Sequence, residues 1–257
     1  MLYKEGFDID FNLHGKTAVI TGAANGIGKA IAIMFARKGV NTVLVDLSDD
    51  VEQVTDTITR LGYEAVSVVA DITDNSSLEY ILQTSVSEFG RIDVLVNCAG
   101  VAMLEDAEKI PEAWWDKTLD INLKASFMLS QAIGIHMIQK GGGKIISLAS
   151  QASVIALERH VAYCSSKAGL VAMTQVLAVE WAKYNITVNA ISPTVVLTEL
   201  GEKAWAGQLG EDMKKQIPAG RFAYPEEVAA CAAYLASDAA DMITGANIVL
   251  DGGYTVK

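Results

Sequence analysis

The chain has 257 residues, 51% of them hydrophobic and 20% charged, and its formal net charge at pH 7 is −11. That length and composition suit one large α/β domain or two small ones. The acidic balance argues against a nucleic-acid partner, which needs a basic face, and no apolar run approaches the roughly 20 residues of a membrane span.

Residues 1–14 mix charged and aromatic side chains, precede the first predicted strand and carry no signal-peptide pattern. We expect a surface arm over residues 1–14 and a single domain over residues 15–257. We also expect a cytoplasmic protein that binds neither nucleic acid nor a membrane.

From residue 16 onward, short β-rich runs alternate with helical patterns. The predicted strands are 17–21, 41–46, 65–70, 94–97, 144–148, 187–191 and 247–250. The predicted helices begin at Gly26, near Asp49 and at Asn75, and then cover about 111–138, 163–184 and 225–237. Several strands are apolar on both faces, which is typical of a parallel sheet covered by helices on each side. The alternation predicts an α/β fold, a doubly wound parallel sheet of about seven strands with helices on both faces.

A glycine-rich segment, residues 21–28 (TGAANGIG), follows the first predicted strand and opens the first predicted helix. Its spacing permits a tight turn and lets backbone N–H groups approach a pyrophosphate at the helix N-terminus. An ordinary strand–helix turn is the alternative, but this position in the chain favours dinucleotide binding. The candidate residues are Gly22, Asn25, Gly26, Ile27 and Gly28.

Asp46 closes the second predicted strand. A carboxylate at this place can accept hydrogen bonds from ribose hydroxyl groups and repels a 2′-phosphate. No arginine follows it to receive such a phosphate, so the sequence favours NAD over NADP, with a simple turn as the alternative. Asp71 and Ile72, after the third strand, could place another carboxylate at the adenine, although a turn explains them nearly as well.

The fourth predicted strand ends in Asn97-Cys98-Ala99-Gly100. Small residues there let a cofactor pass close to the backbone, so Asn97, Ala99 and Gly100 are further cofactor-binding candidates. Tight packing alone would also explain them.

Tyr163 and Lys167 stand four residues apart in a predicted helix, so their side chains share one face. A positive charge beside a phenol favours the phenolate and lowers the pKa of the tyrosine, which makes it a usable proton acceptor. A solvated helix face would be the better interpretation of this pair alone. Ser150 lies upstream, at the end of a predicted strand.

Residues 193–224 break the alternation of strands and helices, and contain Trp205, several glycines and the turn Pro218-Ala219-Gly220. We expect a long irregular insertion that acts as a substrate lid. The cysteines and histidines have no metal-binding spacing, so we expect reduced, buried cysteines and no metal site.

Together these motifs resemble the single-domain short-chain dehydrogenases/reductases, from about Gly15 to Gly253. Segments 21–28 and 97–100, Asn122, Ser150, Tyr163-x3-Lys167 and Ser192-Pro193 stand in the order and approximate spacing of that family. The resemblance implies a single-domain Rossmann fold that binds a nicotinamide cofactor, and Asp46 favours NAD as that cofactor.

The resemblance also implies a role for each catalytic candidate. Tyr163 would be the general acid/base, and Lys167 would lower its pKa and hold the nicotinamide ribose. Ser150 would hydrogen-bond the substrate oxygen, and Asn122 would anchor a water chain that carries the proton towards solvent.

Pro193, Val196 and Thr198 are further cofactor contacts implied by the resemblance, with Thr198 at the nicotinamide carboxamide. Thr194 stands where many members have glycine, so we expect a stiffer loop.

Residues 192–205 and 217–222 resemble the L-xylulose reductase and polyol dehydrogenase branch of the family. A sugar alcohol carries a hydroxyl group on every carbon, and each unpaired polar group would cost about 1–3 kcal/mol, so its site needs several polar partners. The implied substrate residues are Ser150, Gln151, Glu158, His160, Tyr163 and Trp205. Glu158 and His160 could instead form an exposed turn, and Trp205 could belong to a core or an interface.

That branch generally uses NADPH, which Asp46 contradicts. We therefore expect an NAD-dependent enzyme that oxidises a C4–C6 sugar alcohol to its ketose, and the reverse, without a metal. A 3-oxoacyl-carrier-protein reductase or another ketone or diketone reductase is the alternative, and a non-catalytic NAD-sensing protein is a remote one. The family also implies a homotetramer, with residues 114–138 and 248–254 in its contacts.

Overall fold

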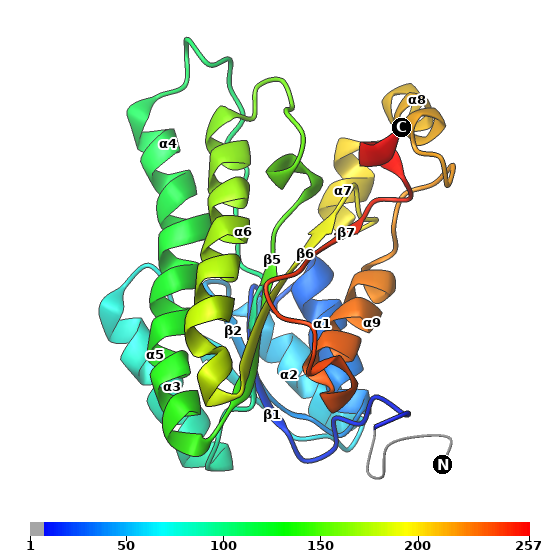
Figure 1. The fold of residues 1–257 in the computed structure, drawn as a ribbon. Helices are drawn as coiled ribbons and strands as arrows, with labels where there is room; N and C mark the ends of the chain where they lie inside the picture. Colours follow the sequence, from blue (N-terminus) through cyan, green and yellow to red (C-terminus); the bar gives the residue numbers. More distant parts are fainter. Residues whose placement is uncertain (1–7) are drawn as a thin grey trace.

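The computed structural model describes residues 8–257, which contain one seven-stranded sheet (Figure 1). The strands are β1 (Thr17–Thr21), β2 (Asn41–Asp46), β3 (Ala65–Val69), β4 (Val94–Asn97), β5 (Gly143–Leu148), β6 (Ile186–Pro193) and β7 (Asn247–Leu250). Their order is β3-β2-β1-β4-β5-β6-β7, and all neighbours are parallel. The predicted doubly wound parallel sheet is confirmed.

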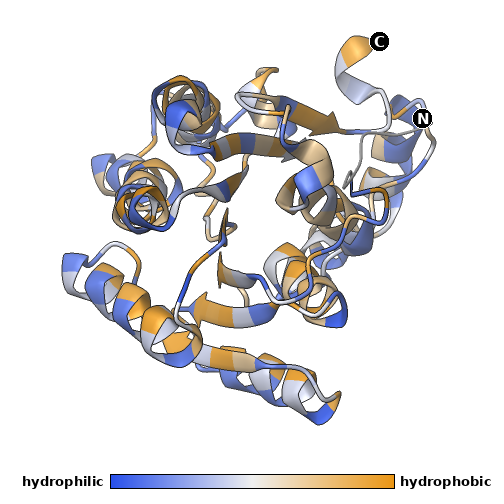
Figure 2. Ribbon diagram, turned by 60° about the horizontal axis from the view of Figure 1, so that its bottom comes forward, coloured by the Kyte–Doolittle hydropathy of each residue, from blue (hydrophilic) through white to orange (hydrophobic). Residues whose placement is uncertain are grey.

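Helices cover both faces of this sheet, as Figure 2 shows. Packed on one face are α1 (Gly26–Arg37), α2 (Asp50–Arg60) and α9 (Pro225–Ala236), and on the other α3 (Asn75–Phe89), α5 (Ser126–Lys140) and α6 (Val161–Trp181). Each face of the sheet has its own hydrophobic core. Because side chains alternate across a strand, Ala18 and Ile20 of β1 belong to the core under α1, α2 and α9, and Val19 belongs to the core under α3, α5 and α6. This explains why the strands are apolar on both faces.

The position of β1 between β2 and β4 sets the place of the site. The chain moves from β1 to β3 in one direction and from β4 to β7 in the other. At such a switch point the loops after two neighbouring strands diverge, which opens a crevice at their carboxyl ends.

The predicted helix over residues 111–138 is divided into three parts. α4 (Glu112–Leu119) is followed by a π-helical turn, η1 (Asp120–Ala125), and then by α5. Asn122 lies in this turn and is fully buried. π-helical turns of this kind are frequent at functional sites.

Residues 194–224 are not the irregular insertion that the sequence predicted. They hold α7 (Glu199–Ala204) and α8 (Gln208–Gln216), which lie near the C-terminus in Figure 1. Met213, Ile217 and Phe222 form a small cluster of their own, against which Trp205 and Tyr254 pack. Contacts with the distant C-terminal segment thus stabilise α7 and α8, and the predicted turn Pro218-Ala219-Gly220 follows α8.

Residues 8–14 of the predicted surface arm are mostly exposed but are anchored on the domain. Leu13 is buried in the hydrophobic core under α1, α2 and α9. The ring of Phe11 lies edge-on to the ring of Tyr234 of α9, with 5.2 Å between the ring centroids. Residues 1–7 of the predicted arm lie outside the described residues. Within residues 8–257, no helix is both long enough and apolar enough to cross a membrane.

Candidate active site

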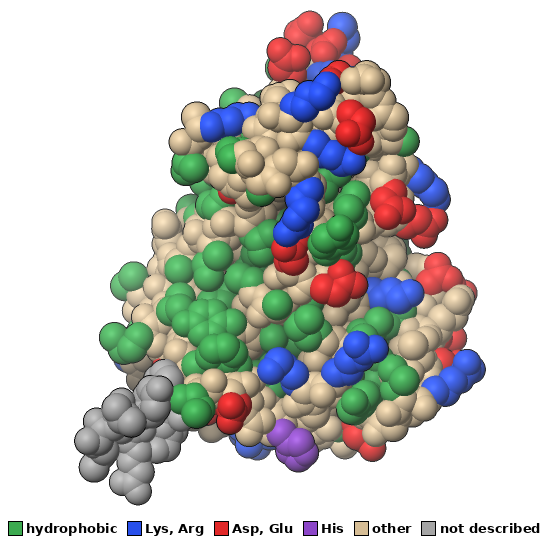
Figure 3. All heavy atoms as spheres, turned by 90° about the vertical axis from the view of Figure 1, so that its right-hand side faces the viewer, with side chains coloured by type: hydrophobic (Ala, Val, Ile, Leu, Met, Phe, Trp, Pro, Cys, Tyr) green, Lys and Arg blue, Asp and Glu red, His purple; other side chains and the backbone are tan. Residues whose placement is uncertain are grey.

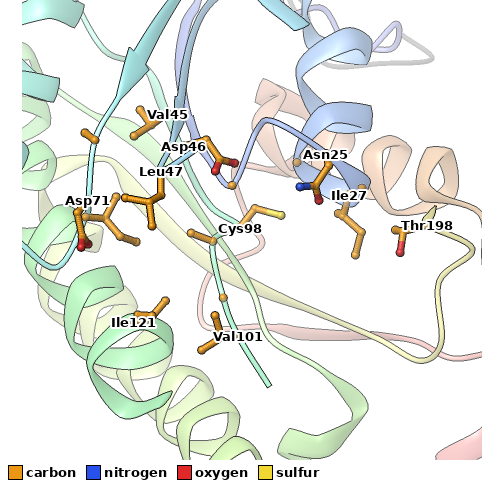
Figure 4. Close-up of a pocket in the computed structure, with 17 residues that line it drawn as sticks. Asn25, Ile27, Val45, Asp46, Leu47, Asp71, Cys98, Val101, Ile121 and Thr198 are labelled. Carbon is orange, nitrogen blue, oxygen red and sulfur yellow. The ribbon is translucent and has the colours of Figure 1, made fainter. Parts of the chain in front are cut away.

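A cavity of about 340 Å³ opens at the carboxyl ends of β1, β2 and β4 (Figure 4). It is lined by Gly22, Asn25, Gly26, Ile27, Gly28, Val45, Asp46, Leu47, Ala70, Asp71, Ile72, Cys98, Ala99, Gly100, Val101, Ile121 and Thr198. In Figure 4, Leu47 and Asp71 lie towards one end, Ile27 and Thr198 towards the other, and Cys98 between them. The cavity brings together most of the cofactor-binding residues that the sequence predicted.

The glycine loop before α1 leaves no room for side chains at two positions. A Cβ atom on Gly22, whose φ is +66°, would lie 2.9 Å from Ala99 Cα, and one on Gly28 would lie 2.1 Å from the Gly22 carbonyl oxygen. The loop therefore folds tightly onto itself and onto the segment after β4. α1 begins at Gly26 in the cavity lining, and its first N–H groups have no intrahelical partner, which favours an anion.

Thr21 has a structural role that the sequence analysis missed. Its hydroxyl oxygen accepts hydrogen bonds from the N–H groups of Cys98 (3.0 Å) and Ala99 (3.1 Å). It thereby ties the end of β1 to the segment after β4 and fixes the floor of the cavity. A threonine directly before the glycine loop was the available signal.

Asp46 does more than end a strand. One carboxylate oxygen accepts the N–H of Ala24 in the glycine loop (3.0 Å), and the other accepts the N–H of Ser48 (3.1 Å). Asp46 thus braces the loop while it lines the cavity. Each carboxylate oxygen keeps a further lone pair that a ligand hydroxyl group can use.

Asp71 and Asn97 are placed differently with respect to the cavity. Asp71 lines it together with Ile72, and its carboxylate also accepts the N–H and the hydroxyl of Thr73 (2.9 and 2.7 Å). The amide of Asn97 instead donates to Ser130 (2.9 Å) and Ser147 (3.4 Å) in the interior. The Asn97 side chain is therefore turned away from the cavity and joins β4 to α5 and β5.

Of the catalytic candidates, Lys167 and Asn122 lie beside Gly100, which lines the cavity. None of the four candidates is itself among the lining residues of the cavity. Lys167 is buried in α6, donates from Nζ to the Leu148 carbonyl oxygen (2.7 Å), and lies 5.7 Å from the centroid of the Tyr163 ring. A Cβ atom on Gly100 would lie 3.5 Å from Lys167 Nζ. Ser150 follows β5 and accepts the N–H of Ala152 on its hydroxyl oxygen (3.2 Å), so its own proton remains free to donate.

The expected low pKa of Tyr163 is wrong for this structure. Burial raises the pKa of the Tyr163 phenol, and the interaction with the Ser150 side chain lowers it only in part. Burial also lowers the pKa of Lys167 to about 8, because the ammonium loses its hydration. Both groups are therefore shifted towards their neutral forms.

Asn122 acts as a clamp. Its side-chain oxygen accepts the N–H of Val101 (2.8 Å), and its amide donates to the Val101 carbonyl (2.9 Å) and to Ser166 (3.0 Å). The π-helical turn is thus joined to the cavity segment after β4 and to α6. These contacts occupy its side chain, and the predicted water chain stays a prediction.

All three cysteines (Cys98, Cys164 and Cys231) form no disulfide. We expected them to be buried, but the side chain of each is partly exposed. Cys98 lines the cavity, where burial raises the pKa of its thiol to about 12. It therefore contributes a small neutral surface.

Pro193, at the end of β6, and Val196, after it, do not line the cavity as predicted cofactor contacts would, whereas Thr198 does.

The predicted substrate residues are only partly brought together. The ring of His160 lies edge-on to Tyr163, 6.0 Å between centroids, and Gln151 is buried directly after Ser150. Glu158 lies in an exposed turn, where its carbonyl oxygen is 2.5 Å from His160 Nδ1. Trp205 packs on Phe222 inside the small cluster of α7 and α8, which fits the core interpretation.

Comparison with known proteins gives matches along nearly the whole chain. A family model described as enoyl-(acyl carrier protein) reductase matches residues 22–255. The chain is 60% identical over 253 residues to the NAD-dependent glycerol dehydrogenase of Listeria innocua serovar 6a, covering 98% of this chain and 99% of that protein. It is 51% identical to the D-threitol dehydrogenase of Mycolicibacterium smegmatis, covering 97% and 96%.

A solved structure agrees with these matches. The short-chain type dehydrogenase/reductase from Mycobacterium marinum has a TM-score of 0.91 and 35% identity, covering 96% of this chain and 98% of that one. Each match spans nearly the whole chain, from the glycine loop through the Tyr163 region. The chain belongs to the short-chain dehydrogenase/reductase family.

Proposed function

We propose that the chain is an NAD-dependent dehydrogenase that oxidises a secondary hydroxyl group of a sugar alcohol to the ketose, and catalyses the reverse reduction. One juxtaposition carries the proposal. The cavity holds a glycine cradle and Asp46, and its lining residue Gly100 lies beside Lys167, whose Nζ is 5.7 Å from the centroid of the Tyr163 ring. The relatives named for glycerol and D-threitol support a polyol substrate.

The cavity lining fits a dinucleotide. The start of α1 would receive the pyrophosphate, because a Cβ atom on Gly22 or Gly28 would close the cradle. Asp46 would accept the adenosine ribose hydroxyl groups and repel a 2′-phosphate, which favours NAD over NADP. Thr198, beside Gly26, would face the nicotinamide end, and Asp71 with Ile72 the adenine.

Oxidation removes a hydride and a proton from a carbinol. NAD supplies the hydride acceptor when bound, and its positive ring favours the phenolate of Tyr163. Tyr163 takes the hydroxyl proton, Ser150 donates a hydrogen bond to the same oxygen, and Lys167 holds the nicotinamide ribose. The hydrogen bond from Lys167 Nζ to the Leu148 carbonyl oxygen (2.7 Å) fixes the position of the Lys167 side chain.

Gln151 supports a polyhydroxylated substrate. It is 6% exposed, and its side-chain oxygen makes no hydrogen bond within residues 8–257. A buried acceptor without a donor is costly, and a substrate hydroxyl group would supply that donor. His160 would offer a second polar contact beside Tyr163, while Glu158 and Trp205 keep only the sequence-based prediction.

We also propose a cytoplasmic homotetramer. Figure 3 shows hydrophobic side chains gathered on the side that is at the right in Figure 1. Val249 on the edge strand β7 and Ile135 on α5 are exposed and lie within the predicted contact segments. Val176 and Val179 are also exposed on α6, which with α5 lies on the opposite side in Figure 1. Sedimentation equilibrium at several chain concentrations would test the tetramer.

The function is tested by NAD reduction at 340 nm and alkaline pH with polyols of three to six carbons, with NADP in parallel. We expect turnover of one or a few polyols with NAD, and none by Tyr163→Phe, which should still bind NAD. Silence across the panel with intact NAD binding would overturn the polyol substrate. Full activity of Tyr163→Phe would overturn the role of Tyr163.

A further inference from the structure

A closed ring of three hydrogen bonds joins the turn η2 (Gln151–Ser153) to the sheet. The hydroxyl oxygens of Ser153 and Ser192 are 3.1 Å apart, Ser192 donates to Asn247 Oδ1 (2.6 Å), and Asn247 Nδ2 donates to Ser153 (3.5 Å). Ser192 belongs to β6 and is fully buried, and Asn247 begins β7. Three segments far apart in the sequence therefore meet here.

The direction of every bond in this ring is fixed. A serine hydroxyl has one proton, and that of Ser192 goes to Asn247, so Ser153 must be the donor between the two serines. Each hydroxyl then donates once and accepts once, and the amide of Asn247 does the same. Hydrogen bonds in such a chain strengthen one another, which makes the ring a firm attachment.

The ring attaches the segment that carries Ser150. The hydroxyl oxygen of Ser150 accepts the N–H of Ala152 (3.2 Å), and its carbonyl oxygen accepts the N–H of Ser153 (2.8 Å). A single 3-10 turn is weakly stable alone, and Val154, which follows it, is exposed. The orientation of the Ser150 hydroxyl group thus depends on what holds Ser153.

We infer that Asn247 is a positioning residue, which acts through Ser153 and Ser192 to aim the Ser150 hydroxyl group at Tyr163 and the substrate oxygen. The inference rests on the proposed roles of Ser150 and Tyr163. Asn247 itself touches no reacting group, so it could not be found from motifs around Ser150. It would set how well the site is pre-organised.

The titration of Tyr163 distinguishes a positioning role of Asn247 from a purely structural one. Burial raises the pKa of Tyr163, and the interaction with Ser150 lowers it. The other titratable groups beside the phenol are Lys167, Cys98, Cys164 and His160, and none of them is a member of the ring. Loss of the ring should therefore remove only the Ser150 contribution, and the pKa of Tyr163 should rise.

The experiment compares Asn247→Ala with Asn189→Ala as a matched control. Asn189 is also buried on β6 and also joins it to the segment before β7, through Ile243 O (2.7 Å) and the N–H of Ala246 (3.0 Å). Within residues 8–257, its side chain makes no hydrogen bond to η2. Ser153→Ala breaks the same ring from the other side, and serves if Asn247→Ala unfolds. Phenolate absorbance at 295 nm is recorded for each protein minus its Tyr163→Phe counterpart.

We expect kcat for the oxidised alcohol to fall roughly 10- to 100-fold in Asn247→Ala and Ser153→Ala, with the dissociation constant for NAD within twofold. The pKa of Tyr163 in both ring variants should rise to its value in Ser150→Ala. Asn189→Ala should change neither this pKa nor kcat. An unchanged titration in both ring variants, or an equal shift in Asn189→Ala, would overturn the inference. Because the phenolate readout needs no substrate, a wild-type enzyme silent on polyols would refute the proposed substrate and still leave the ring tested.

Discussion

Replacing Lys167 with Met tests whether the buried ammonium destabilises the native state. Lys167 is 5% exposed, and burial lowers its pKa from 10.5 to about 8. The difference, 10.5 − 8, corresponds to about 3 kcal/mol of destabilisation at pH values well below 8. Methionine has a similar length and no charge, so it removes this penalty together with the hydrogen bond to Leu148.

The sign of the pH dependence separates the penalty from the lost hydrogen bond. Between pH 8 and 10.5 the unfolded chain binds more protons at Lys167 than the native protein, so the wild type gains stability as pH rises. Methionine does not titrate, and the lost hydrogen bond and altered packing do not depend on pH. Relative to Lys167→Met, the wild type should therefore gain about 2 kcal/mol between pH 7 and 9.5.

Urea unfolding followed by tryptophan fluorescence, at one chain concentration and several pH values, measures this difference. Lys183→Met is the control, because Lys183 is exposed and its loss removes the same formal charge. A stability difference between wild type and Lys167→Met that stays constant from pH 7 to 9.5 would refute the reasoning.

Three further predictions concern the cavity and the C-terminal segment. Asp46→Asn should raise the KM for NAD roughly 10- to 150-fold, as expected for the loss of a charge-assisted hydrogen bond worth about 1.5–3 kcal/mol. It should also reduce the preference for NAD over NADP, and an unchanged ratio of the two kcat/KM values would contradict this. Gly22→Ala should lower the free energy of unfolding by about 2–4 kcal/mol through a left-handed φ and contact with Ala99, whereas Gly62→Ala, with φ +85° and nothing within 4 Å, should lose only the conformational part. Asp251 accepts hydrogen bonds from Gly253 and Thr255 that outweigh its burial and lower its pKa; its stabilisation is present above pH 3.8 and is lost as pH falls below it, so the stability difference between wild type and Asp251→Asn should shrink in acid.

The sequence predicted those parts of the site that depend on local order along the chain. Gly22, Asp46 and Ser150 each stand at or just after the end of a predicted strand, and parallel strands bring their carboxyl ends to one edge of the sheet. Tyr163 and Lys167 share a helix face for the same local reason. Correct strand boundaries were therefore enough to place these residues together.

The remaining features depend on contacts between distant segments. The amide of Asn97 pairs with Ser130 and Ser147, which no pattern around Asn97 shows. The helices α7 and α8 depend on a cluster that includes Tyr254. The pKa of Tyr163 was predicted in the wrong direction because spacing shows which charge is near, but not how much water burial removes.

The shifted pKa values of Lys167 and Tyr163 predict how NAD binding depends on pH. Burial moves Lys167 towards its neutral form near pH 8 and keeps the Tyr163 phenol protonated. A positively charged nicotinamide ring bound beside them would lower the pKa of Lys167 further and lower that of Tyr163 from its raised value. NAD binding near pH 8 should therefore release protons, and its affinity should rise with pH. NADH carries no such ring charge and should release fewer.

Calorimetric titration in two buffers of different ionisation enthalpy measures that release directly. If Lys167 and Tyr163 are its source, Lys167→Met should reduce it near pH 8, and Tyr163→Phe should reduce it at higher pH. Proton uptake on NAD binding, or equal release with NADH, would mean that the nicotinamide does not bind beside this pair. In that case the nicotinamide charge would not offset the effect of burial on the pKa of Tyr163, and Tyr163 would not be activated by cofactor binding.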